Sequence, residues 1–229
     1  MKGLDCIKEF ASLEETTFRP YNQVLLDMYS GGDPLGFGIG IGGPRWKEQR
    51  RFASRALKDL SEGQKGMEVK ILKEVGHTID HIRSLLAQKK QKLEEVGKFL
   101  ITPNLNVIWG LVAALRYDFT DPEPQEQFRY LKTFFGEKLA GPITFVPWLH
   151  YFFPFSGIYK KIIKAMDSFR ILLKNVIKDQ RATFDQSNIR GYIDLFLQAQ
   201  EEKQGHYFTD QDLLIGCQDL FIAGNLLFF

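Results

Sequence analysis

Apolar residues recur at steps of three and four along most of the chain, which is the spacing that places them on one face of an α-helix. Residues 65–92 carry such a stripe, and residues 158–184 carry a longer one whose basic side chains mostly lie off the apolar face. Residues 103–116 are almost uncharged, which predicts a helix buried on most sides. Shorter helices are expected over residues 2–15, 44–60, 124–139, 192–203 and 213–224. Hardly any segment alternates as a strand would, so the sequence predicts an all-α fold.

Residues with special backbone preferences indicate where several elements begin and end. The glycines and prolines between residues 16 and 43 predict a long loop there. Pro44 suits the first position of the helix that follows. Thr209, with an acidic side chain three residues later at Asp212, forms a variant of the capping box and opens the last helix. That helix is expected to stop at residues 225–229, whose free apolar end would be costly in water, so we expect a chain cut inside an element.

The composition narrows the class of protein. The 229 residues are 44% hydrophobic and 25% charged, as in ordinary globular proteins. The formal net charge of +2 does not suggest nucleic-acid binding. Two cysteines, Cys6 and Cys217, are too few for a disulfide framework and fit a reducing compartment. We expect no signal peptide, and the sequence contains no stretch of 18 apolar residues that could span a bilayer as a helix. Phenylalanine is unusually frequent, with 20 residues. So much bulky apolar surface requires a large core, a lipophilic ligand or a membrane.

One segment, residues 139–159, has no formally charged side chain when His150 is neutral. Aromatic residues crowd its middle, and its three prolines interrupt it too often for a spanning helix. Two interpretations remain open for it, a buried loop or an interfacial segment that dips into lipid. The second is favoured because Trp and Tyr prefer the depth of the lipid headgroups.

Two motifs are weak on inspection. Residues 38–43 match G-x-G-x-x-G before a helix, but no strand precedes them, so a flexible loop bordering a cavity is the better interpretation than a dinucleotide site. His77 and His81 have the spacing of two zinc ligands on a helix. The intervening residues lack a catalytic Glu and no third ligand is evident, which favours a solvated helix face.

The helix that opens at Pro44 carries a more informative pair. Trp46 and Arg50 are one turn apart on the same face, and both side chains are hydrogen-bond donors only. Two side chains that only donate hydrogen bonds, placed side by side, predict an anionic acceptor such as a carboxylate or a phosphate. The alternative is a surface cation–π stack of Arg50 on Trp46. Further basic residues make the helix from Arg45 to Lys58 a solvated face or a docking face for an acidic partner.

W-x-x-x-R at the start of a helix, after a glycine-rich loop, resembles the third-helix motif of the cytochrome P-450 haem-thiolate monooxygenases. Three other segments resemble that family in the expected order, namely Glu14-Glu15-Thr16-Thr17-Phe18-Arg19-Pro20, Tyr192-Ile193-Asp194-Leu195-Phe196-Leu197 and Asp219-Leu220-Phe221-Ile222-Ala223-Gly224. The last is similar to the opening of the oxygen-binding motif A-G-x-[DE]-T. The chain is most similar to the microsomal branch, which hydroxylates drugs, steroids and other lipophiles.

The resemblance implies a haem b cofactor, with Trp46 and Arg50, and also Arg19, binding a propionate. It implies that a lipophilic substrate is lined by Phe37, Ile39, Phe134, Phe135, Leu139 and Ala223. The segment from Pro142 to Phe155 is then the membrane contact, and the basic helix Arg45–Lys58 docks an NADPH-dependent reductase. The implied location is the cytosolic face of the endoplasmic reticulum membrane.

The sequence also departs from the family pattern. Leu226 and Leu227 stand where the family has its acid–Thr pair, and neither can donate a proton. The loop that carries the axial thiolate is not found around Cys6 or Cys217. We therefore interpret residues 1–229 as one partial cytochrome P-450 domain, inactive by itself. A non-catalytic, membrane-associated helical binding protein and a pseudogene product are the alternatives.

Overall fold

The computed structural model describes residues 3–13, 16, 21–38, 40–62, 66–87, 96–136, 140–202 and 207–225. Within these ranges the chain is helical and contains no strand, so the all-α prediction is confirmed. The first helices are α1 (Leu4–Ser12), α2 (Gln23–Ser30), α3 (Pro44–Ser61), α4 (Met67–Ala87) and α5 (Val96–Val112). The later ones are α6 (Glu123–Gly136), α7 (Ala140–Phe145), the 3-10 helix η3 (Pro147–Tyr151), α8 (Phe155–Ala182), α9 (Tyr192–Glu202) and α10 (Asp210–Asn225).

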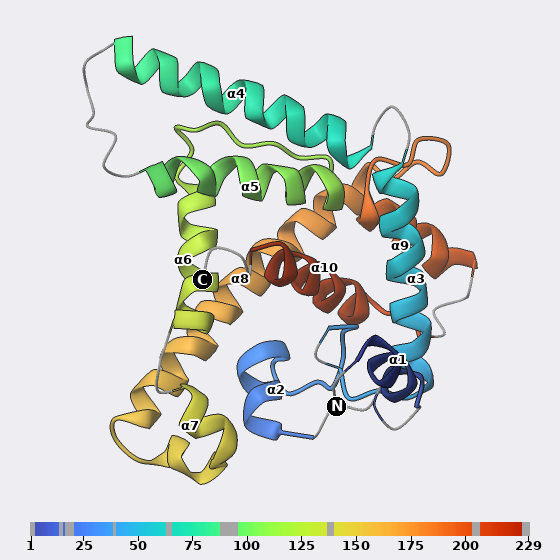
Figure 1. Ribbon diagram of the computed structural model, residues 1–229, viewed down its shortest axis with the longest axis vertical. Helices are drawn as coiled ribbons and strands as arrows, with labels where there is room; N and C mark the ends of the chain where they lie inside the picture. Colours follow the sequence, from blue (N-terminus) through green and yellow to red (C-terminus); the bar gives the residue numbers. More distant parts are fainter. Residues whose placement is uncertain are drawn as a thin grey trace.

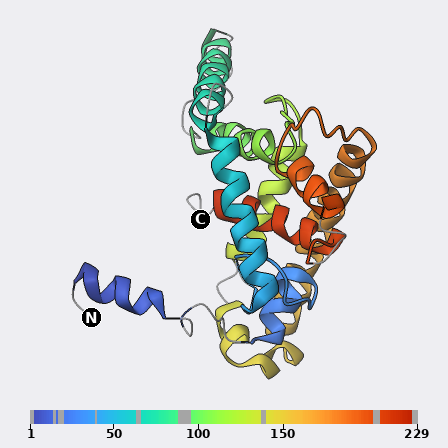
Figure 2. The same ribbon diagram turned by 90° about the vertical axis from the view of Figure 1, so that its right-hand side faces the viewer.

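Helix α10 lies at the centre of the molecule, where it packs against α5, α8 and α9 (Figure 1). Helix α4 lies on the outer side of α5, and α3 runs along one edge beside α9 (Figure 1). The short helices α2 and α7 gather at the end where α8 begins. Helix α1 projects away from this body (Figure 2).

The predicted burial of the last helix is confirmed. All residues from Leu213 to Ile222 are buried, and α10 contributes Phe221 to the core. Its N-terminus has the predicted capping box, in which the backbone N–H of Thr209 donates to Asp212 over 2.9 Å and the Thr209 hydroxyl accepts from the Asp212 N–H over 3.3 Å. Helix α8 likewise buries the predicted apolar face, including Ile162, Met166 and Phe169.

The predicted loop over residues 16–43 was wrong in part, because it contains α2. The Asn22 side chain caps this helix by accepting the Leu25 N–H over 3.0 Å, and Gly31 ends it in a left-handed conformation. An eight-residue helix survives because Val24, Leu26 and Met28 are buried in the core. The glycine-rich part, residues 31–43, is a loop as predicted.

Two other helices differ in detail from the prediction. Helix α5 begins at Val96 and has Pro103 inside it, and it ends at Val112, just before the left-handed residue Ala114. On α4 the buried residues are polar, because Glu74 accepts from Arg116 Nε over 2.7 Å and from Asn106 Nδ2 over 3.2 Å at the α5 interface. The apolar stripe of α4 is largely exposed instead (Ile71, Leu72, Val75, Ile79 and Leu86).

Most of the described part of the uncharged segment is helical, and Ile143 is its fully buried side chain. The segment forms α7 and η3, and its large aromatic side chains are exposed. Phe145 is 87% exposed and Phe153 is 91% exposed, so the buried-loop interpretation was wrong. Of the helices in the described ranges, none combines the length and the apolar character needed to cross a bilayer.

Candidate functional site

Trp46 and Arg50 converge on a single acceptor, as their spacing predicts. Trp46 Nε1 donates to the backbone oxygen of Phe37 over 3.1 Å, and Arg50 Nη1 donates to the same oxygen over 3.4 Å. Arg50 Cζ also lies 5.3 Å from the centroid of the Trp46 ring, so the cation–π contact is present as well. The first two turns of α3 therefore present two side-chain donors to one carbonyl oxygen of the glycine-rich loop.

Asp219 of α10 holds that loop from the other side. Its carboxylate accepts the backbone N–H groups of Phe37 over 2.7 Å and Gly38 over 2.9 Å, and it also accepts the hydroxyl of Tyr29. The sequence analysis quoted Asp219 within a motif and gave it no role. The sequence does contain an indication of its role, because a carboxylate within the largely apolar, buried run of α10 requires hydrogen-bond partners.

The loop requires glycine where it approaches α10. Gly36 has a φ of +95°, and a Cβ atom there would lie 2.7 Å from Asp219 Oδ2 and 2.8 Å from Ile215 Cγ2. A Cβ atom at Gly40 would collide with the carbonyl oxygen of Gly36. The glycines therefore serve the close approach of the loop to α10. The loop also borders a pocket through Gly36, Ile41 and Gly42, as the interpretation of the motif predicted.

The apolar residues proposed around a substrate are only partly described. Phe37 is half-buried, and Ala223 is exposed one turn after Asp219 on α10. Phe134 and Phe135 are half-buried on α6, with ring centroids 5.0 Å apart, and Phe134 lies 5.8 Å from the ring of Tyr29. Phe134 thus connects to Phe37 through Tyr29 and Asp219. Outside the described residues lie Arg19, Ile39, Leu139, Leu226 and Leu227.

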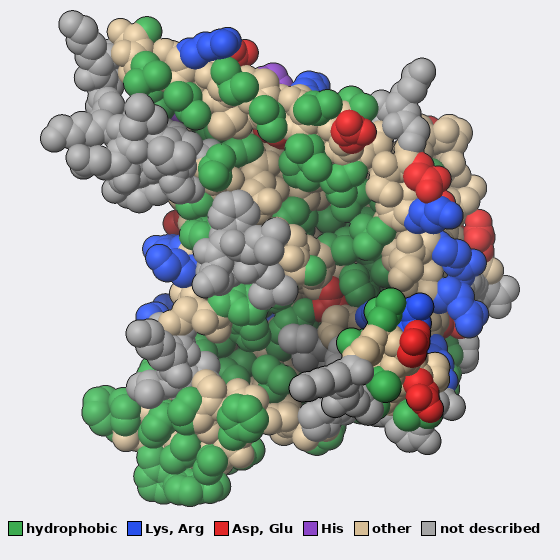
Figure 3. Space-filling view, viewed as in Figure 1, with side chains coloured by type: hydrophobic (Ala, Val, Ile, Leu, Met, Phe, Trp, Pro, Cys, Tyr) green, Lys and Arg blue, Asp and Glu red, His purple; other side chains and the backbone are tan. Residues whose placement is uncertain are grey.

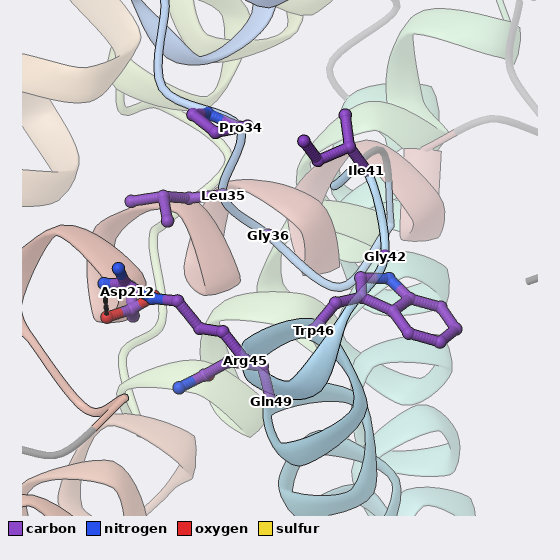
Figure 4. Close-up of a pocket in the computed structure, with 9 residues that line it drawn as sticks. All are labelled: Pro34, Leu35, Gly36, Ile41, Gly42, Arg45, Trp46, Gln49 and Asp212. Atoms are coloured by element: carbon purple, nitrogen blue, oxygen red, sulfur yellow. Dashed lines mark hydrogen bonds and ion pairs between the residues drawn. The ribbon is translucent and has the colours of Figure 1, made fainter. Parts of the chain in front are cut away.

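Arg45 has a structural partner that the sequence did not reveal. Its guanidinium binds Asp212 with Nε to Oδ1 at 2.9 Å and Nη2 to Oδ2 at 2.6 Å. The pair borders a pocket of 190 Å³ between the loop, α3 and α10, and Trp46 is also among the residues that line it (Figure 4). Arg51, Arg55 and Lys58 remain exposed on α3.

The histidines and cysteines lie apart from this site. His77 is exposed, and the ring of His81 stacks on Phe119 with centroids 4.2 Å apart. Across the described ranges, no three His, Cys, Asp or Glu residues are placed to hold a metal ion. Cys6 is exposed on α1, whereas Cys217 is buried and burial raises the pKa of its thiol far above the usual range.

The free energy of unfolding is expected to fall as the pH rises through the titration of Asp219. Burial raises the pKa of this carboxyl from 3.8 to about 6. Its contribution to stability is fully present below the unfolded pKa and is lost as the pH rises through the folded one, a change of about 3 kcal/mol. Urea unfolding of Asp219→Asn and of the parent from pH 4 to pH 7 checks this, because asparagine does not titrate. A difference between the two proteins that does not vary with pH would contradict the expectation.

Comparison with known proteins gives the chain a family. A sequence model described as Cytochrome P450 matches residues 3–225. Cytochrome P450 2D28 of Mesocricetus auratus is 30% identical over 192 residues, which cover 80% of this chain and 37% of that protein. Cytochrome P450 2H1 of Gallus gallus is 31% identical over 189 residues, covering 80% of this chain and 37% of that protein.

Cytochrome P450 2D26 of Rattus norvegicus matches further along the chain, with 28% identity over 233 residues that cover 98% of this chain and 45% of that protein. The chain thus spans less than half the length of these curated relatives. The family match covers nearly the whole chain, including the Trp46–Arg50 pair and all of α10 in its described extent. The chain therefore belongs to the cytochrome P450 family.

Proposed function

We propose that this chain is part of a haem-dependent monooxygenase that hydroxylates lipophilic substrates with dioxygen and electrons from a reductase. The observation that carries the proposal is the convergence of Trp46 and Arg50 on one acceptor, in a chain whose family match covers residues 3–225. The match favours this function over a non-catalytic binding protein or a pseudogene product. In this proposal residues 1–229 form one partial domain.

The donor set at α3 fits a haem carboxylate. Arg50 is exposed, and its single hydrogen bond within the described ranges is the one to Phe37, so most of its guanidinium N–H groups can bind a propionate. The single N–H of Trp46 donates to the Phe37 carbonyl, so Trp46 binds a propionate by exchanging that acceptor for the carboxylate. Arg19 is proposed as a further contact. When bound, haem supplies the iron that activates dioxygen.

The two cysteines do not fit the role of iron ligand. Cys217 lies inside the core with its thiol held protonated by burial, and Cys6 lies on the projecting helix α1. Leu226 and Leu227, at the positions of the acid–Thr pair, have no proton to give. We therefore propose that residues 1–229 by themselves are inactive.

The chain's contribution to substrate binding is apolar. Phe37 is positioned by the two backbone hydrogen bonds of its loop to Asp219, and Phe134 packs on the Tyr29 ring that contacts the same carboxylate. Phe135, Ala223, Ile39 and Leu139 complete the proposed lining. A cavity lined in this way excludes water and favours a lipophilic substrate.

Two surfaces are proposed for partners. The exposed residues Arg51, Arg55 and Lys58 of α3 make a basic face for an acidic NADPH-dependent reductase, while Arg45 is engaged by Asp212. The exposed aromatic residues between Pro142 and Phe155 suit the interfacial region of a bilayer. We propose the cytosolic face of the endoplasmic reticulum membrane as the location.

A chimaera tests the haem assignment. Residues 3–225 replace the matching segment of the rat relative, and the purified chimaera is assayed for haem content and for the spectrum of its ferrous–CO complex. We expect Arg50→Gln to lower haem retention roughly tenfold, because a charge-assisted hydrogen bond is lost. Arg51→Gln, an exposed neighbour, is the matched control and is expected to retain haem fully.

The outcomes separate the parts of the proposal. Equal haem retention by Arg50→Gln and Arg51→Gln would rule out the propionate role of Arg50. A chimaera with native helix content and no haem would overturn the proposed function. Residues 1–229 alone are expected to show no thiolate-type Soret band, and such a band would refute their proposed inactivity.

A further inference from the structure

We infer that the membrane contact is selective for anionic phospholipids, and that Lys160 and Lys164 at the start of α8 provide the selectivity. This rests on the proposed membrane contact and adds the chemistry of the lipid. We define the aromatic tip as the exposed aromatic side chains of α7, η3 and the two residues after η3 (Phe145, Trp148, Tyr151, Phe152 and Phe153).

The aromatic tip has the properties of an interfacial anchor. Trp148 is 60% exposed and Tyr151 is 75% exposed, so ring surface that is costly in water is available for lipid. The tip forms a continuous hydrophobic surface at the corner of the molecule where α7 lies (Figure 3). Its residues come from α7, η3 and the two residues after η3, and α7 and η3 contact each other and α8.

Positive charge borders this uncharged surface. From residue 138 to residue 166 the sequence contains four lysines and no acidic residue, and three of the lysines follow the tip at the start of α8. Lys160 and Lys164 are both exposed, and neither forms an ion pair within the described ranges. Lipid headgroups with net negative charge are the partner that complements lysines beside an inserted aromatic surface.

Two acidic residues, one on α2 and one further along α8, have partners of their own. Asp27 on α2 accepts from Gln23 Nε2 over 2.6 Å and from the Tyr159 hydroxyl over 3.1 Å. Asp167 on α8 pairs with Arg170 over 2.5 Å. The exposed ammonium groups of Lys160 and Lys164 are therefore available to an external partner.

With α8 rising from the membrane along its axis, as this inference requires, the two lysines lie near the depth of the headgroups. With a rise of 1.5 Å per residue, Lys160 lies about 8 Å along α8 from Phe155 and Lys164 about 14 Å. An interfacial segment inserts roughly 5–10 Å, and the Debye length is about 8 Å in physiological salt. Both ammonium groups are therefore close enough to interact with the charge of the lipid headgroups. Lys174 and Lys178 are exposed on the same helix but lie about 28 and 34 Å from Phe155, beyond that range.

Vesicle co-sedimentation of the whole chain tests the inference. The vesicles contain phosphatidylcholine alone or with about a third of phosphatidylserine, and the proteins are the parent, Lys160→Gln/Lys164→Gln, Lys174→Gln/Lys178→Gln and Phe153→Ser. On anionic vesicles we expect the first double variant to bind about 30-fold more weakly than the parent, and the second to change binding by less than about threefold. On neutral vesicles both should match the parent. Phe153→Ser should weaken binding to both kinds of vesicle.

Each result has a distinct meaning. The inference would be overturned if the parent bound neutral and anionic vesicles equally well, or if the two double variants lost the same amount of binding. The proposed membrane contact itself would not be affected by either result. No binding of the parent to either vesicle, or no loss in Phe153→Ser, would overturn the proposed membrane contact itself. Because none of these residues touches the Trp46–Arg50 site, the haem proposal is tested separately by the chimaera.

Discussion

Replacing Trp109 with alanine is expected to lower the free energy of unfolding by about 4 kcal/mol, since large-to-small changes of fully buried aromatic residues cost 3–5 kcal/mol. Trp109 has no exposed surface, and its ring centroid lies 4.4 Å from that of Phe221 on α10. Its indole N–H donates to Gln127 Oε1 on α6 over 2.7 Å. The substitution opens a cavity where three helices meet, and it also leaves a buried amide oxygen without its donor.

Urea unfolding followed by circular dichroism measures this loss. Trp148→Ala is the matched control, because Trp148 is 60% exposed and its removal is expected to change the free energy by less than about 0.5 kcal/mol. Trp109→Phe should fall between the two, since it keeps most of the ring volume and loses the hydrogen bond. A loss below about 1 kcal/mol in Trp109→Ala would show that α5, α6 and α10 do not depend on this contact.

Replacing Arg45 with alanine is expected to cost about 2 kcal/mol. The partner carboxylate, Asp212, has a side chain only 1% exposed, and breaking a buried pair by removing one member leaves a charge without compensation. The full cost for a buried pair is 3–5 kcal/mol. The expected value is smaller because the Arg45 side chain is 39% exposed and Thr209 still donates to Asp212.

The same unfolding assay checks this prediction, with Arg51→Ala as the matched control from the exposed side of α3. Adding Asp212→Asn to Arg45→Ala should recover part of the loss, because the uncompensated charge is removed. Equal stability of Arg45→Ala and Arg51→Ala would refute the structural role of the pair.

Helical periodicity predicted the helices well where local and tertiary preferences agree. Helices α8, α9 and α10 occupy nearly the predicted ranges, because their apolar faces are also the faces that pack in the core. Helix α2 was missed because eight residues beside a glycine-rich loop are marginal as an isolated helix, and burial of Val24 and Leu26 stabilises it. On α4 the period was correct, but the stripe does not face the neighbouring helix, since Glu74 and Arg116 direct the packing.

In the candidate site, too, the local arrangement could be predicted from the sequence and the long-range contacts could not. The spacing of Trp46 and Arg50 was enough to place two donors side by side, because i,i+4 neighbours meet on any α-helix. Their common acceptor, the Phe37 carbonyl, depends on how the glycine-rich loop turns back, and the sequence did not indicate it. Asp219 escaped assignment because its partner Phe37 is 182 residues away in the chain.

By itself the sequence determined the all-α class, most helix ranges, the Thr209 capping box and the family resemblance, all of which depend on residue spacing within a few turns. Only the tertiary structure decided that Asp219 anchors the loop, that Asp212 engages Arg45 and that the aromatic tip is exposed. The physical reason is that backbone hydrogen bonding repeats over four residues and can be inferred from local order. Long-range contacts depend on which apolar faces pack together, and that is settled by the whole chain at once.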